Sequence, residues 1–234
     1  MLLVILFFIV FCINLARSFN LSVFDNIRIS FLKTYLLVLL ISIFITESLS
    51  FFNAINYKNI LFCWILVFFL SLVFLIKNVN KLKFFFIKLK TSGIFIKKNY
   101  LLLILVSIFL FLIPLFFIAY YYPPNTGDSL GYHLPRVEHW IKNKNVDHYP
   151  TGDIRQLFHQ PLSEFVILNL NLLSNSDNWA NYIQFFAMIG SIFLITLLVK
   201  FFGLDYRYQI LSAILSFTVS MGILQATSTQ TDYL

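Results

Sequence analysis

The apolar stretches along this chain constrain its fold more than any other feature of the sequence. They lie at about residues 1–16, 34–52, 59–76, 100–120, 179–202 and 210–224. A helix of about 20 apolar residues crosses the hydrocarbon core of a bilayer, and several of the stretches reach that length. With a mean hydropathy of +0.84 and 12% charged residues, the chain falls outside the range of soluble domains. The sequence therefore predicts an all-α, polytopic transmembrane helix bundle with about six spans.

The placement of lysine and arginine predicts the orientation of these spans. After the third stretch comes a run of lysines: Lys77, Lys81, Lys83, Lys88, Lys90, Lys97 and Lys98. If this run is a cytoplasmic loop on the lipid headgroups, alternation of the spans puts most of the 17 basic residues inside, as the positive-inside rule requires. The polar loop 121–178 then lies on the non-cytoplasmic side of the cell (inner) membrane. Nucleic acid is not an expected partner despite the net charge of +7, because the basic residues sit between apolar stretches.

The chain divides into two membrane regions by its pattern. Residues 1–99 hold three spans and the basic loop, and residues 100–234 hold the polar loop 121–178 with the remaining spans. Cys12 and Cys63 lie inside apolar stretches, where they indicate neither a disulfide framework nor a metal motif. The four histidines, His133, His139, His148 and His159, do not follow the spacing of zinc ligands. No metal site and no cofactor is predicted, although the pattern leaves assistance by a divalent ion open.

The interval 123–161 gathers most of the titratable chemistry of the chain. Asp128 follows the helix-breaking sequence PPNTG, and a helix beginning at Leu134 would place Pro135 at its first position. That helix is amphipathic and is expected to lie in the membrane interface. Two interpretations of Asp128 remain open, a helix cap and a general base that accepts a proton during attack on an activated carbon. Arg136 and Arg155 suit phosphate oxygens, and for each an interfacial or carboxylate-paired role is about as good an interpretation.

Two motifs resemble a known enzyme family. GDSLGYHLPRVEHWIKNKNVDHYPTGDIRQLFHQPLSE and ILQATSTQTDYL are similar to segments of the polytopic GT-C glycosyltransferases, closest to the bacterial family 39 type that is related to protein O-mannosyltransferases and lipid A aminoarabinose transferases. The resemblance covers about residues 100–234 and does not extend to the first three spans. It implies that Asp128 and Asp232 are catalytic carboxylates. It also implies a substrate-binding set, which is Tyr132, His133, Arg136, Arg155 and His159.

The resemblance implies transfer of a sugar from a polyprenyl-phosphate donor to a lipid, glycan or protein acceptor, with inversion at the anomeric carbon, in the cell envelope. Membrane lipids are the other expected partner. Protein mannosyltransferases carry an Asp-Glu doublet where this chain has Asp128-Ser129, which leaves the class of acceptor open. Because such enzymes usually continue through more spans, the chain is expected to be an N-terminal fragment. The alternatives are a non-catalytic membrane scaffold or relic, and part of a transporter of lipid-linked glycans.

Overall fold

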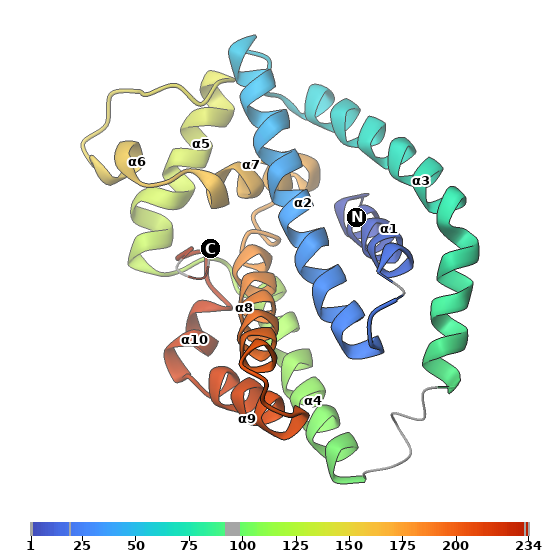
Figure 1. The fold of residues 1–234 in the computed structure, drawn as a ribbon. Helices are drawn as coiled ribbons and strands as arrows, with labels where there is room; N and C mark the ends of the chain where they lie inside the picture. The colour runs from blue at the N-terminus through green and yellow to red at the C-terminus, as the bar shows by residue number, and fades with distance from the viewer. Residues whose placement is uncertain (1, 19, 92–98, 232, 234) are drawn as a thin grey trace.

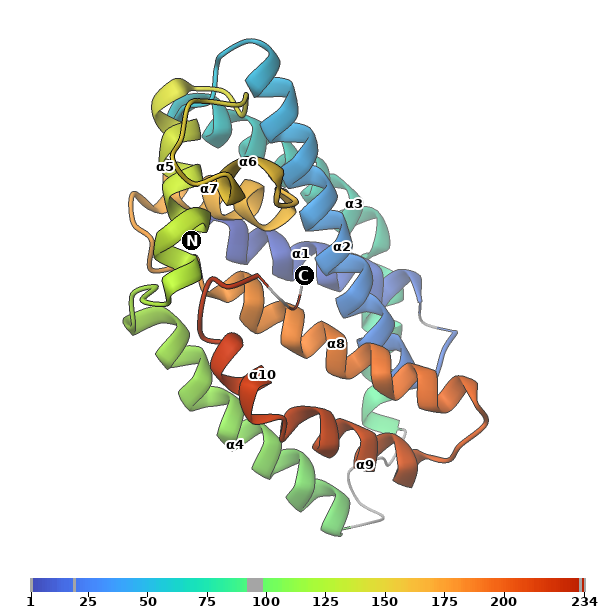
Figure 2. The ribbon, with the colours of Figure 1, turned by 90° about the vertical axis from the view of Figure 1, so that its left-hand side faces the viewer.

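The computed structural model of the chain describes residues 2–18, 20–91, 99–231 and 233, with side chains described outside 91–109. It is all-helical, with 77% of the residues in helices and no strand in the described ranges. Figures 1 and 2 show an elongated bundle in which helices near both ends of the chain lie side by side. The predicted all-α class is confirmed.

The helices follow one another with short connections. Their bounds are α1 Leu2–Arg17, α2 Val23–Phe51, α3 Tyr57–Thr91, α4 Asn99–Tyr121, the π-helix η1 Ser129–His133, α5 Leu134–Asn143, α6 Arg155–Phe158, α7 Leu162–Ser174, α8 Tyr182–Phe201, α9 Tyr206–Phe217 and α10 Ser220–Gln225. Helix α5 begins at Leu134 as predicted and holds Pro135 in its first turn. Helix α8 begins at Tyr182, a few residues later than expected, because Asp177 closes a turn with the amide of Ala180 instead of capping the helix.

Three helices are long and apolar enough to cross a membrane: Val23–Phe51, Tyr57–Lys90 and Tyr182–Phe201. These match three of the six predicted spans. Leu2–Arg17 and Leu110–Tyr121, the part of α4 with described side chains, are shorter apolar helices. The single span expected at about residues 210–224 is two helices, since α9 ends at Phe217 and α10 begins at Ser220, with Val219 in an extended conformation between them.

The polar segments next to the spans are more helical than the sequence suggested. Helix α2 begins at Val23, where the hydroxyl of Ser22 caps its first turn, so Asp25 and Arg28 lie within the helix and not in a linker. Helix α3 continues through Lys77 to Thr91. In that extension Phe85 is buried against α1 and α2, and this packing supports a helix where a loop was expected. Lys97 and Lys98 lie outside the described residues.

One hydrophobic core joins the two regions of the chain. It contains Leu6 of α1, Trp64 of α3, Val137 of α5 and Ile183 of α8, with most of the first half of α7. Small polar residues on α2 are buried at intervals of four or eight residues: Asn26, Ser30, Thr34, Ser42 and Thr46. Small residues let helices approach closely and their hydroxyls bond to neighbours, as is common between helices in membranes.

The connections between helices gather at two ends of the bundle. At one end, the turn after α2 contacts the segment after α5, because Asn145 donates to Asn53 and the amide of Val146 donates to Ser50. At the other end, Lys88 donates to the carbonyl of Leu21, and Arg28 donates to Gln209. The first end carries α5, α6 and α7 (Figures 1 and 2), which here is called the loop end. The basic segments gather at the second end.

Candidate functional site

The predicted site residues are brought together at the loop end by an irregular helix. Ser129–His133 forms a π-helix that runs directly into α5. Such wide turns accommodate one extra residue and are frequent at functional sites. Asp128 stands just before it and makes no capping hydrogen bond with its side chain. The cap interpretation therefore finds no support in the contacts, and the carboxylate is left for other partners.

The exposed part of the cluster is a carboxylate beside a guanidinium. Nη1 of Arg155 lies 3.7 Å from Oδ1 of Asp128, and both side chains are nearly half exposed, at 46% and 44%. Arg155 is held in place by Asp153, to which Nη2 donates at 2.7 Å. These hydrogen bonds raise the pKa of Arg155 and lower the pKa of Asp153. In the described structure no hydrogen bond occupies the Asp128 carboxylate, so it is free to accept one from a ligand.

The Asp128–Arg155 pair packs against aromatic rings. The guanidinium carbon of Arg155 lies 4.7 Å from the centroid of the Tyr132 ring, a cation–π distance. The His159 ring stacks on Tyr132 with centroids 4.9 Å apart. Tyr132 is only 8% exposed, so its ring packs within the protein and offers little surface to a ligand. Its contacts fix the position of Arg155.

Beneath the exposed pair lies a buried ionic cluster of Glu164, His133 and Arg136. Glu164 is 0% exposed, and its Oε1 lies 2.9 Å from Nδ1 of His133 and 3.5 Å from Nη1 of Arg136. Arg136 also donates to the carbonyl of His159 at 2.7 Å. Burial lowers the pKa of Arg136, and the charge of Glu164 opposes that change. The cluster joins η1, α5 and α7, so it orders the elements that carry the exposed pair.

Both nitrogens of the His133 ring have hydrogen-bond partners, and which atom donates depends on the tautomer. Its Nδ1 faces a carboxylate, and its Nε2 lies 3.1 Å from the carbonyl oxygen of Gln230, with the Thr231 hydroxyl slightly farther at 3.4 Å. A neutral imidazole has one N–H and one acceptor nitrogen. Both short contacts are hydrogen bonds when the ring carries two protons, or when Glu164 is protonated and donates to Nδ1. With a neutral ring and an ionised Glu164, Nδ1–H donates to Glu164 and Nε2 accepts from the Thr231 hydroxyl instead.

His133 also fastens the C-terminal segment to the site. Gln230 and Thr231 contact its ring, and the amide of Tyr233 donates to Gln184 on α8. Asp232, predicted as the second catalytic carboxylate, lies outside the described residues. Its described neighbours in sequence are thus held at the same end of the bundle as Asp128.

Sequence reasoning missed Glu164 and Gln156. Glu164 lies in the apolar pattern of residues 162–173, and α7, which contains it, is a central element of the core. The available signal was a lone ionisable residue inside an apolar helix, which marks a functional or paired group. Gln156 has no such signal; it accepts from Tyr149 and donates to the carbonyl of Gly131, which links α6 to η1.

The donor set does not resemble a dedicated metal centre. Within the described ranges, no group of three or more His, Cys, Asp or Glu side chains is placed to hold an ion. His133 and Glu164 bind each other, His159 stacks on Tyr132, and His139 stacks on Tyr149.

Together the fold and the site define an all-helical chain with three candidate membrane-spanning helices, which fits a membrane protein with an ionic cluster at one end. Comparison with protein-family models, with curated proteins and with solved structures gives no match for this chain.

Proposed function

We propose that the chain acts as a membrane glycosyltransferase that moves a sugar from a polyprenyl-phosphate donor to an acceptor on the non-cytoplasmic face. The observation that carries the proposal is the exposed Asp128 carboxylate 3.7 Å from the Arg155 guanidinium, next to apolar helices. A lipid-linked donor needs such a pair, because its phosphate lies at headgroup level while its isoprenoid tail lies in the bilayer. The motif resemblance of this region to GT-C enzymes gives the same reaction.

The chemistry assigns a role to each member of the pair. The acceptor hydroxyl attacks the anomeric carbon, and its oxygen forms the new glycosidic bond. The bond between that carbon and the phosphate oxygen breaks with inversion, and the polyprenyl phosphate leaves. Asp128 accepts the proton of the acceptor hydroxyl, as a general base within hydrogen-bond reach. Arg155 binds the phosphate oxygens and offsets the charge that develops on the leaving group.

The proposal includes the finer topology. Besides the three candidate spans, α1, α4 and the pair α9–α10 would complete a bundle of about six spans, with the loop end outside the inner membrane. The grouping of the basic segments at the opposite end of the bundle supports this orientation under the positive-inside rule.

Substitution of Asp128 tests the proposal directly. The chain is reconstituted in liposomes with a panel of polyprenyl-phosphate hexoses, and release of polyprenyl phosphate is followed, because this product appears whatever the acceptor. Asp128→Asn should lower the rate by about 100-fold or more, the usual contribution of a general base. Asp147→Asn removes the same charge from an exposed residue of the same end and should leave the rate unchanged.

Two results would count against a transferase. Full activity in Asp128→Asn removes the assigned base, and the reaction would then need another residue. Absence of product from the unaltered chain with every donor favours the membrane scaffold, in which the ionic cluster only joins helices.

A further inference from the structure

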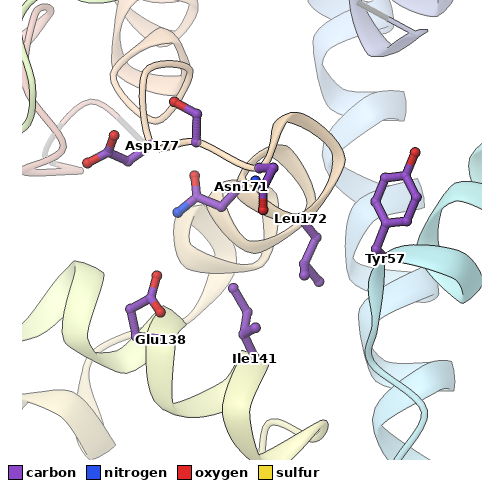
Figure 3. Close-up of a pocket in the computed structure, with 8 residues that line it drawn as sticks. Tyr57, Glu138, Ile141, Asn171, Leu172 and Asp177 are labelled. Carbon is purple, nitrogen blue, oxygen red and sulfur yellow. The ribbon is translucent and has the colours of Figure 1, made fainter.

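A hollow lies between α5, α7 and the start of α3. It has a volume of about 560 Å³, in the range of small-molecule sites. Figure 3 shows Glu138 and Ile141 on α5, Asn171 and Leu172 on α7, and Tyr57 at the start of α3 around it. Asp177, in the segment after α7, lines it as well. None of these residues belongs to the transferase proposal.

The charged groups of this pocket are both carboxylates. Glu138 and Asp177 are exposed carboxylates, and neither forms an ion pair in the part of the chain that the structure describes. No Lys, Arg or His is among the residues that line the pocket. Lys142, one turn beyond Glu138 on α5, lines an adjoining shallow hollow. Two negative charges thus meet in a chain whose net charge is +7.

Asn171 adds an independent sign of a missing ligand. Its side chain lines the pocket, is only 9% exposed, and has a buried Oδ1 with no hydrogen-bond partner. A buried polar atom without a partner is costly, and native structures contain few of them. Because the pocket borders this amide, a bound molecule can supply the donor after a small rotation of the side chain.

We infer that this pocket binds a small molecule with a protonated primary amine on an apolar body. An ammonium group offers three donors and no acceptor, which matches the three acceptors of Glu138, Asn171 and Asp177. The opposite wall, formed by Tyr57, Ile141 and Leu172, suits an apolar body. A bare metal ion fits less well, because the cavity is far larger than an ion with its first coordination shell. The amine is either a free compound or the headgroup of an amine-bearing lipid.

The inference is tested with a matched pair of probes on the full chain in phosphatidylcholine nanodiscs. Phenethylamine and 2-phenylethanol differ only in the ammonium group, and their binding is followed by calorimetry. Phenethylamine should bind saturably and at least about tenfold more tightly than the alcohol, the preference that one charge-assisted hydrogen bond typically gives. Glu138→Gln with Asp177→Asn should abolish that preference, and Asn171→Leu should reduce it.

The controls separate this pocket from a general effect of charge. Asp147→Asn removes a carboxylate elsewhere on the loop end, and Lys142→Gln removes the nearby cation; both should retain the preference. Competition by phosphatidylethanolamine nanodiscs identifies a lipid headgroup as the source, and lack of competition identifies a free amine. Equal binding of amine and alcohol, an unchanged preference in the double variant, or displacement of the amine by micromolar calcium would overturn the inference. None of these readouts depends on sugar transfer.

Discussion

At the scale of single residues, the other two side chains of the buried ionic cluster depend on Glu164. In the part of the chain that the structure describes, its carboxylate pairs with both His133 and Arg136, and its second oxygen accepts from Ser163 at 3.1 Å. Removing one partner of a buried ion pair leaves the other charge without compensation, which usually costs more than the pair contributes. In the described structure Arg136 also donates to the carbonyl of His159, which is uncharged, and its buried Nε has no partner.

The substitution Glu164→Gln should therefore destabilise the chain by about 3 kcal/mol, as expected for breaking a buried ion pair. The amide retains the shape of the side chain but not its charge, so the effect reports electrostatics more than packing. Thermal and chemical unfolding in detergent would measure it. Glu138→Gln makes the same chemical change on an exposed face of α5 and should stay within about 0.5 kcal/mol. Equal effects of the two variants would show that the ion pairs of Glu164 contribute nothing to stability.

At the scale of elements, the sequence predicted helices better than it predicted where they end. The apolar stretches predicted α2, α3 and α8, and Pro135 predicted the start of α5. The run of lysines after the third apolar stretch was interpreted as a loop. Exposed lysines occur both in loops and on helices whose other face is packed, so the sequence did not distinguish the two. The π-helix at Ser129–His133 had no sequence signal, since one extra residue in a turn changes no composition.

Shortening η1 tests what its extra residue does. Deletion of Leu130, which is 56% exposed, removes little buried surface and should let the segment close into an α-helix. Asp128 would then turn by about 100° relative to His133, the rotation of one helical residue, and would no longer lie beside Arg155. In a background of Cys12→Ser and Cys63→Ser, Asp128→Cys and Arg155→Cys should be bridged by a short bifunctional thiol reagent in the full-length helix, and less so after the deletion. Cross-linking that is unchanged by the deletion would contradict this role of η1.

At the scale of the whole molecule, the segments between helices sort into two ends, one of them rich in basic residues. Alternation of apolar stretches with short basic segments predicted this sorting, and the contacts of Asn145 with Asn53 and of Arg28 with Gln209 are what the structure adds. The joining of the chain's two regions through one core was not predictable, because apolar periodicity identifies a buried face without identifying the partner that covers it.

Accessibility to a membrane-impermeant maleimide measures the topology. In the same cysteine-free background, Asn53→Cys and Asn145→Cys should both react in intact cells, since both residues lie at the loop end. Lys90→Cys, at the opposite end of α3, should react only after the membrane is opened. Reaction of Asn53→Cys and Asn145→Cys from opposite sides of the membrane would contradict the arrangement of the helices.

The length of α3 has a mechanical consequence. Its 35 residues extend for about 50 Å, whereas the hydrocarbon of a bilayer is about 30 Å thick. The curved helix wraps around α1 (Figure 1), and its lysine-bearing end is tied to the α1–α2 connection through Lys88 and Leu21. If α3 spans a bilayer, a thinner bilayer that tilts the helix would also displace the α1–α2 connection, because Lys88 joins the two.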